Sequence, residues 1–150
     1  MDEATIEAAR RGDRPAQGRL LSALQDVWFR FCLSQLRSAE QARDATQETA
    51  LRFLRQLSSF RGESQLKTWS LSIALNVVRE MRRRRCATSE NEVDLNQLAP
   101  ERSSGGFEQA DHVESRQLLR AQLANLPDRQ REALVLRFFE DLSIDETAIA

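Results

Sequence analysis

Between positions 69 and 85 the chain carries an aromatic ring, a side-chain amide and several arginines at helical spacing. Trp69 and Asn76 are seven residues apart, so in a helix they lie about 20 degrees from the same azimuth, and Arg79 continues along that side. An unpaired base can stack on a tryptophan, an amide can hydrogen-bond its edge, and arginines can hold phosphates. Core packing for Trp69 and a solvated polar side chain for Asn76 are the alternatives that the residues leave open.

The run Arg82–Arg85 ends the same segment and is fully cationic. Arginines near a helix C-terminus complement its dipole, so a solubilising helix end is the simpler interpretation. Four in succession exceed that need, and we favour contact with duplex phosphates. The loop before the segment, Phe60-Arg61-Gly62, has a glycine suited to a tight turn, and Arg61 and Lys67 add phosphate-binding charge. A generic connection between helices is the alternative for this loop.

A second polar surface lies upstream. Asp44, Glu48 and Arg52 are four residues apart, with Gln47 and Arg55 beside them, so they form one stripe of a helix. Such a stripe can bind a partner through paired charges, or it can form ion pairs within its own helix. The residues alone leave both possibilities open.

Helices must position these residues. The chain has 150 residues, 41% of them hydrophobic, with only 5 glycines and 3 prolines, which argues against a many-turned β-sandwich or barrel. Apolar residues at three- and four-residue steps predict helices over about 16–37, 38–57 and 65–85, after a short helix over 3–11. Ser38 and Gln41 form an S-x-x-Q capping box. We therefore expect an all-α fold.

The second half of the chain is organised differently. Residues 86–111 are rich in Ser, Asn, Glu and Gly and predict a flexible linker. Helical periodicity returns over about 112–124 and over 129–139, after Pro127, and an S-x-x-E capping box at Ser143–Glu146 begins a further helix. The expected organisation is a helical domain over 1–85, a linker over 86–111 and a partial helical domain over 112–150.

Charge is distributed unevenly. Through Arg85 the chain has 16 Lys and Arg against 10 Asp and Glu, and from Cys86 onward it has 6 against 13. A basic half beside an acidic half indicates a polyanionic partner for the first, ordinary solvated faces being the alternative. No apolar run approaches the roughly 18 residues of a membrane span, and the N-terminus has no secretory signal. We expect a cytoplasmic protein without membrane insertion.

Catalysis is not expected. Two cysteines and one histidine cannot build a disulfide framework or the usual metal clusters, so we expect no metal and no cofactor. Cys32 lies on an apolar stripe and is interpreted as a core residue. Neither Cys86 nor His112 has a catalytic partner at a supporting spacing. A binding module is therefore favoured over an enzyme, and no catalytic residue is assigned.

Three segments, in order along the chain, resemble bacterial sigma factors of the sigma-70 family, in the extracytoplasmic-function group. The segment Asp44–Arg55 is similar to D-x-x-Q-E-x-x-L-R, and Phe60–Asn76 is similar to F-R-G-x-x-x-F-x-T-W…I-A-x-N. The third, Leu126–Ser143, is similar to L-P-x-x-Q-R-E…L-R-x-x-E-x-L-S. Each motif alone is weak, but three in this order with a linker between them are specific.

The resemblance implies a promoter-specificity subunit that binds core RNA polymerase and recognises and opens the minus-ten element of promoter DNA. It assigns polymerase contact to the stripe Asp44, Gln47, Glu48, Arg52 and Arg55. It assigns DNA contact to the loop and the helix that follows it, at Phe60, Arg61, Lys67, Thr68, Trp69, Asn76, Arg79, Arg82, Arg83, Arg84 and Arg85. It also implies an anti-sigma factor as a partner.

The chain stops at Ala150, inside what the resemblance implies is the first helix of a helix-turn-helix. We expect the natural protein to be longer, and we expect the given chain, which lacks the recognition helix, not to read the minus-thirty-five element. Two other functions stay open. One is a helical module that binds another protein through Trp28, Trp69 and Phe138–Phe139, and the other is a different DNA-binding regulator of transcription.

Overall fold

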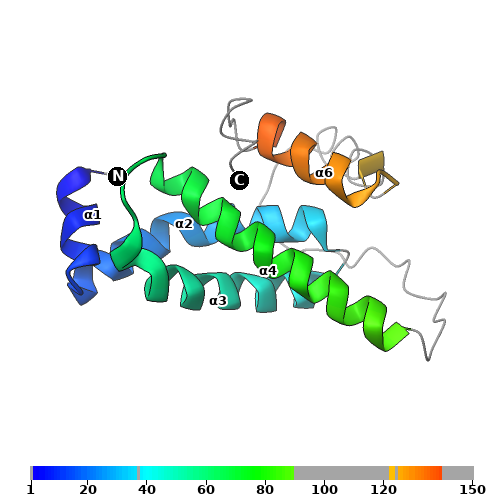
Figure 1. Ribbon diagram of the computed structural model, residues 1–150, viewed down its shortest axis with the longest axis horizontal. Coiled ribbons are helices and arrows are strands. Elements are labelled where there is room, and N and C mark those ends of the chain that lie inside the picture. The colour runs from blue at the N-terminus through cyan, green and yellow to red at the C-terminus, as the bar shows by residue number, and fades with distance from the viewer. Residues whose placement is uncertain (1, 37, 90–121, 124, 140–150) are drawn as a thin grey trace, which may run out of the picture.

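A computed structural model describes residues 2–36, 38–89, 122–123 and 125–139, and every regular element in these ranges is helical (Figure 1). The fold is all-α, as predicted. The elements are α1 (Glu3–Arg10), α2 (Arg14–Gln35), α3 (Ala39–Gln56), the 3₁₀ turn η1 (Leu57–Ser59), α4 (Leu66–Ser89), α6 (Asp128–Leu134) and the π-helical turn η2 (Val135–Phe139).

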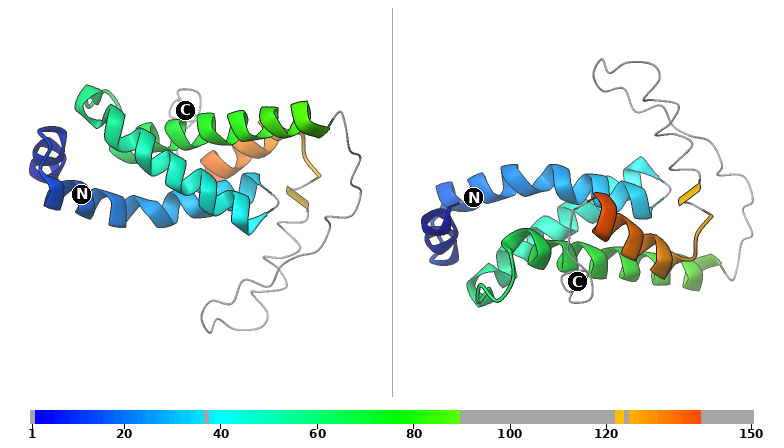
Figure 2. Two further views of the ribbon diagram at one scale, coloured as in Figure 1. Left: turned by 90° about the horizontal axis from the view of Figure 1, so that it is seen from below. Right: turned by 90° about the horizontal axis from the view of Figure 1, so that it is seen from above.

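Helices α2, α3 and α4 pack against one another as a bundle, and α1 crosses one end of it (Figure 1). Helix α6 contacts α2, and in both views of Figure 2 it runs between α2 and α4. Within the described residues no helix is long and apolar enough to cross a membrane. The bundle therefore presents α3 on one side and α6 on another, with α4 in contact with both.

The first two helices are joined by a tight turn whose residues explain where α2 begins. Gly12 has a φ of +93°, a conformation that favours glycine. Asp13 then caps α2, because its Oδ1 accepts a hydrogen bond from the Ala16 amide at 2.7 Å. Pro15 fits the first turn, where its missing N–H costs nothing. The helix thus begins at Arg14, two residues before its predicted start.

The predicted capping box at the start of α3 forms in half. The Ser38 hydroxyl accepts a hydrogen bond from the Gln41 amide at 3.3 Å, as expected of an N-cap. The Gln41 side chain does not return to Ser38 and instead accepts from Arg85 of α4 at 3.5 Å. The cap therefore fixes where α3 begins, and its second residue helps to join α3 to α4.

An aromatic cluster forms the centre of the bundle. Trp28 of α2 and Phe53 of α3 are fully buried with ring centroids 5.2 Å apart, and the Trp28 indole donates to the Ser70 hydroxyl of α4 at 3.0 Å. This hydrogen bond satisfies the polar edge of a buried ring. Cys32 is buried beside them, and burial raises the pKa of its thiol to about 12. Its predicted place in the core is confirmed.

Later boundaries differ from those predicted. Helix α4 continues to Ser89, so the first residues assigned to the linker are helical. Pro127 precedes α6 as its N-cap, and the helix predicted over 129–139 is divided into α6 and the wider turn η2. The rest of the predicted linker, the helix expected over 112–121 and the capping box at 143–146 lie outside the described residues.

Candidate nucleic-acid and polymerase interfaces

Trp69 and Asn76 lie on α4, which begins directly after the Phe60–Gln65 loop. The Trp69 ring is half-buried between two phenylalanines, with centroids 5.1 Å from Phe60 and 5.6 Å from Phe53. Asn76, two turns further along, is exposed. Core packing therefore holds for one side of the Trp69 ring, and the rest reaches the surface on the helix that carries the Asn76 amide, where base stacking stays a prediction.

Two residues assigned to DNA contact are not presented to solvent. Phe60 is 7% exposed because its ring packs against Trp69, and Thr68 is 1% exposed because it lies on the core side of α4. In this arrangement their side chains position the loop and the start of α4. A contact with DNA would need to come from their neighbours.

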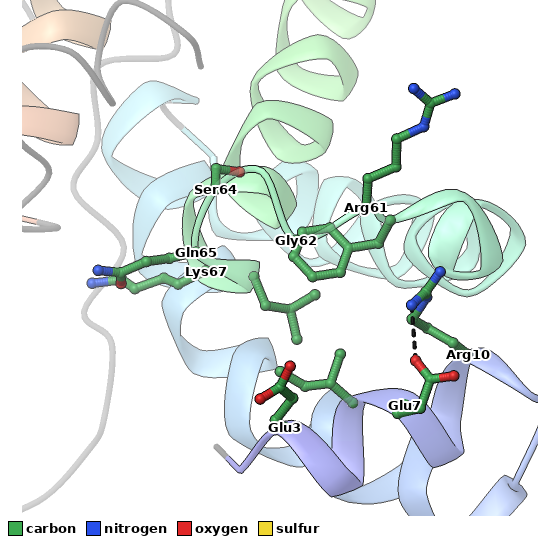
Figure 3. A pocket seen from close by; sticks show the side chains of 11 residues that line it. Glu3, Glu7, Arg10, Arg61, Gly62, Ser64, Gln65 and Lys67 are labelled. Carbon is green, nitrogen blue, oxygen red and sulfur yellow. Dashed lines mark hydrogen bonds and ion pairs between the residues drawn. The ribbon is translucent and has the colours of Figure 1, made fainter.

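The loop before α4 forms one wall of a pocket of about 490 Å³, whose opposite wall is α1 (Figure 3). Gly62 turns the chain with a φ of +75°, which favours glycine. Arg61 is exposed, with Glu63 4.0 Å away, and Figure 3 shows Arg61 and Lys67 projecting from different sides of the pocket. The predicted tight turn is confirmed, and two cations flank the opening.

The share of α1 in this pocket was not foreseen from the sequence. Its lining from α1 consists of Glu3, Ile6, Glu7 and Arg10, of which Arg10 donates to Glu7 at 2.8 Å (Figure 3). No local signal could have revealed it, because the residues of the two walls are fifty or more positions apart in the chain.

The arginines of α4 separate into two groups. Arg83, Arg84 and Arg85 are exposed. Arg79 and Arg82 instead hold Glu132 of α6: Arg79 Nη2 lies 2.9 Å from Glu132 Oε2, and Arg82 Nη1 lies 2.7 Å from Oε1. Sequence spacing suggested one cationic surface, but two of its members are paired with Glu132, and of these Arg79 is 47% exposed and Arg82 15% exposed in the side chain.

Gln35, Arg131 and Glu132, to which the sequence analysis assigned no role, take part in this contact between α4, α6 and the end of α2. Arg82 also donates to Gln35 of α2, to its backbone oxygen at 2.9 Å and to Oε1 at 2.8 Å. Arg131, next to Glu132, is 5% exposed and donates to the same Gln35 backbone oxygen at 3.3 Å. Arg131 and Glu132 stand in the third quoted motif, so a signal was present, whereas nothing in the sequence singles out Gln35.

The α3 stripe also divides. Asp44, Gln47 and Arg55 are exposed, as a binding surface requires. Arg52 is directed across to α4, where it holds both carboxylate oxygens of Glu80 at 2.8 and 2.7 Å, and it bonds Glu48 at 2.6 Å. The hydrogen bonds from Arg52 hold the pKa of the Glu80 carboxyl below its usual value. Arg52 thus joins α3 to α4.

An apolar residue that the sequence reasoning passed over lies on the exposed side of α3. Leu51 is 51% exposed, four residues after Gln47 and four before Arg55. These three therefore share one face of the helix. The signal was available, because the buried positions of α3 are Ala42, Ala45, Thr49 and Phe53, and Leu51 lies out of phase with them. An exposed leucine among polar groups is suited to a protein contact.

Comparison with known proteins agrees with the motifs. The profile of Sigma-70 region 2 matches residues 20–87, and that of Sigma-70 region 4 matches residues 116–150. The chain is 35% identical to the probable RNA polymerase sigma-C factor of Mycobacterium bovis, over 95% of the chain and 75% of that protein. It is 31% identical to the ECF RNA polymerase sigma factor BldN of Streptomyces coelicolor, over 95% of the chain and 54% of that protein.

One chain of the solved RsbN–BldN complex is also similar, with a TM-score of 0.47 and 27% identity over 96% of this chain and 81% of that chain. The described residues form helices only, and the two profile matches are to regions of sigma factors, which are transcription initiation factors. The chain belongs to the sigma-70 family of bacterial RNA polymerase sigma factors, in its extracytoplasmic-function group. It spans about half the length of BldN.

Proposed function

We propose that this chain is a promoter-specificity subunit that binds core RNA polymerase through α3 and the minus-ten element of promoter DNA through α4 and the loop before it. It acts by binding, and the polymerase supplies the chemistry. The observation that carries the DNA assignment is the placement of a half-buried Trp69 ring, fixed between two phenylalanines, on the same helix as exposed Asn76 and a cationic C-terminal end.

Strand opening requires a site that stabilises an unpaired base. A ring held rigidly by Phe53 and Phe60 offers a stacking surface at little entropic cost, since its rotamer is already fixed by packing. The Asn76 amide has donors and an acceptor that can pair with the edge of an extruded base. Together they supply stacking and edge recognition within two turns of one helix.

Phosphates would be held at both ends of this base-binding region. Arg61 projects from the loop at the start of α4, and Arg83–Arg85 are exposed near its end. Trp69 and Arg83 are fourteen residues apart, which is about 21 Å along a helix, or roughly six nucleotides of stacked strand. A strand lying along α4 would therefore meet cations before and after the bases it exposes.

The polymerase contact is proposed for the exposed face of α3. Asp44, Gln47 and Arg55 provide charge and hydrogen-bonding groups that fix register, and Leu51 provides apolar area at the centre. Glu48 and Arg52, also in the predicted set, take part through the ion pairs that hold α3 against α4. The proposed surface therefore lies on a helix whose opposite side is held against α4 by the bonds between Arg52 and Glu80.

The family resemblance leads us to propose an anti-sigma factor as a further partner. Such a protein would inhibit by covering the α3 or the α4 surface. We place this chain in the cytoplasm, where it would meet core RNA polymerase and promoter DNA.

The test is co-purification with core RNA polymerase, followed by a promoter-opening assay on a supercoiled template that carries promoters of the host. We expect the chain to remain with the core and to make the minus-ten region of some promoters reactive to a single-strand-specific probe. A chain that binds the core but opens no promoter in any salt condition would contradict the DNA assignment. A chain that binds neither core nor DNA would favour the protein-interaction module.

A further inference from the structure

We propose that Arg82 is a positioning residue for polymerase binding: it holds the connection between α2 and α3, residues 36–38, and thereby places the exposed face of α3. Arg82 stands in the basic run that the resemblance assigns to DNA contact, so one member of that run receives a different task. The inference rests on the proposed function, because it takes the exposed face of α3 as the surface that core polymerase contacts.

One nitrogen of Arg82 serves two oxygens of Gln35, the last residue of α2. Arg82 Nη2 lies 2.9 Å from the Gln35 backbone oxygen and 2.8 Å from Gln35 Oε1. A guanidinium Nη carries two N–H groups, so Gln35 uses both of them. The Arg82 side chain is 15% exposed and Gln35 is 2% exposed, so the contact is largely shielded from water. Burial strengthens charge-assisted bonds of this kind.

The end of α2 needs such a donor. The last carbonyl groups of a helix have no partner within the helix and lie at the negative end of its dipole, so a guanidinium suits them. The next residue, Leu36, is extended, with φ −107° and ψ 137°, and is 5% exposed. The chain therefore leaves α2 at a buried place, where water cannot readily satisfy the oxygens of Gln35.

The same part of α4 also meets the first turn of α3. Arg85, one turn after Arg82, donates to Gln41 Oε1 at 3.5 Å. The Gln41 amide in turn donates to the Ser38 hydroxyl, the N-cap of α3, at 3.3 Å. Arg82 and Arg85 therefore contact the two sides of the connection, the end of α2 and the start of α3.

Helix α3 is thereby held against α4 by polar contacts at two places. Near its C-terminal end Arg52 bonds both carboxylate oxygens of Glu80, and before its start the connection is held by Arg82. Asp44 and Gln47 of the proposed polymerase face lie between these two places. A binding surface keeps its geometry only where supporting hydrogen bonds fix it, so loss of Arg82 should displace this part of the face.

Arg82→Met tests the inference, because methionine fills much of the same space and has no N–H group to donate. In the free 150-residue chain, amide hydrogen exchange of Leu36 and Gln41 should become about tenfold faster, the effect of losing roughly one hydrogen bond to a charged group. The Ala16 amide, in the cap at the other end of α2, should keep the parent's rate. Unchanged exchange at Leu36 and Gln41 would overturn the inference.

Glu132→Gln is the matched control. Arg82 donates to Glu132 through Nη1 at 2.7 Å, so this variant leaves both bonds of Nη2 to Gln35 in place. Exchange at Leu36 and Gln41 should then stay close to the parent's rate. Equal acceleration in the two variants would overturn the inference, because α6 and not Arg82 Nη2 would then hold the connection.

A second measurement separates positioning from phosphate binding. Arg82→Met should bind core polymerase about fivefold more weakly, at the low end of couplings between sites. With core in excess, its complex should bind a promoter strand with the parent's salt slope. Arg83→Gln is the comparison: Arg83 is exposed on the same helix, so this variant should keep core affinity and flatten the slope by about 0.7. A flatter slope in Arg82→Met with parent-like core affinity would make Arg82 a phosphate contact and overturn the inference.

Two milder changes decide the question if Arg82→Met lowers the thermal midpoint. Arg82→Lys keeps a charge that can bond a Gln35 oxygen, so it should recover part of the core affinity. Gln35→Met removes Oε1 alone and should weaken core binding less in the Arg82→Met background than in the parent, because both residues act through one contact. No recovery with lysine, or losses that simply add, would overturn the inference.

Failure of the proposed function can be told apart from failure of the inference. If the parent binds core polymerase and Arg82→Met binds it equally well, the inference is overturned and the proposed function stands. If the parent does not bind core, the proposed function fails and the placing of a polymerase face fails with it. Faster exchange at Leu36 and Gln41 together with weaker core binding supports both.

Discussion

Helix α4 forms ion pairs on two sides, with α3 through Glu80 and with α6 through Arg79 and Arg82. In the first, Arg52 and Glu80 join two long helices that also bury Phe53 and the rest of the aromatic cluster between them. In the second, Glu132 joins α4 to a seven-residue helix with little apolar area of its own. The same chemistry therefore joins two long, well-packed helices in one place and seats one short helix in the other.

The difference lies in what remains when the charges are removed. Without Arg52, α3 still packs on α4 through its buried face. Without Glu132, α6 keeps the hydrogen bond from Arg131 to the Gln35 backbone oxygen and the contacts of a few apolar residues such as Val135 and Leu136. We infer that the α3 contact keeps the proposed polymerase surface in shape, while the α6 contact depends more on its ion pairs for its strength.

The largest effect is expected on the α6 side. Glu132→Gln removes a buried carboxylate charge that pairs with the largely buried Arg82 and the exposed Arg79, which should weaken the seating of α6 by about 2–4 kcal/mol. Hydrogen exchange of the amides over 128–136 should accelerate accordingly, with the amides of α2, α3 and α4 unchanged.

Asp128→Asn is the matched control on the same helix. Asp128 is 57% exposed, with Arg131 2.9 Å away, so its loss should cost under about 1 kcal/mol. Equal acceleration in the two variants would show that burial of Glu132 is not what seats α6.

The next effect concerns the other side of the bundle, where the polymerase surface is proposed. The double variant Gln47→Ala and Leu51→Ala should weaken binding to core polymerase by about 2 kcal/mol, because both residues lie near the centre of the exposed face. Its thermal midpoint should stay close to the parent's, since surface changes cost under about 0.5 kcal/mol.

Gln25→Ala, on an exposed position of α2, supplies the control for this prediction. Core binding should be measured by competition with a labelled sigma subunit. Parent-like affinity in the double variant would move the polymerase contact away from this face.

Much of the fold could be predicted because its signals are local. Apolar spacing predicted α2 to α4, Ser38 caps α3 as its capping-box pattern indicated, and Cys32 follows the apolar stripe into the core. Helix α4 runs past Arg85 because Cys86 and the following residues carry no glycine or proline that would end it. Pro127 indicated where α6 begins, but no residue indicated that the α-helix changes to the π-helical turn η2 at Val135.

The site was predictable only in outline, because its decisive contacts are tertiary. Spacing put Trp69 and Asn76 on one helix, but it could not show that Phe60 and Thr68 turn inward or that Arg52 reaches across to Glu80. Nothing in the sequence indicated that Glu132, some fifty residues further along, would meet Arg79 and Arg82. Charge counts identify a cationic region but not which of its members are already paired.

A third prediction separates base contact from phosphate contact on α4. Asn76→Ala should reduce discrimination between the correct minus-ten base and others by about 1–3 kcal/mol, with an unchanged salt dependence. Replacing Arg83–Arg85 with glutamine should weaken binding to all sequences. It should also flatten the logarithmic salt slope by about 0.7 for each phosphate of a single strand that the variant no longer neutralises. Anisotropy titrations of promoter strands with core polymerase present measure both.

The two variants serve as controls for each other. If Asn76→Ala kept full discrimination while the arginine variant kept the parent's salt slope, the strand would not lie along α4. The Arg83–Arg85 variant also leaves Arg79 and Arg82 paired with Glu132, so any phosphate contact that remains in it is not made by the last three arginines of the run.

The smallest effect is expected for the ion pair between Arg52 of α3 and Glu80 of α4. Arg52→Met keeps much of the side-chain packing and removes the bidentate bond to Glu80, which should lower the free energy of unfolding by about 1 kcal/mol, since both groups are partly exposed and partly screened. Arg52 lowers the pKa of Glu80 in the folded chain below the unfolded value near 4.5. The contribution of this pair is therefore fully present above that value and is lost as the pH falls through the lowered pKa. Urea unfolding of parent and variant at pH 7 and at pH 3 should show the gap between them narrowing in acid. A gap that stayed constant would mean that Arg52 stabilises through its aliphatic packing and not through Glu80.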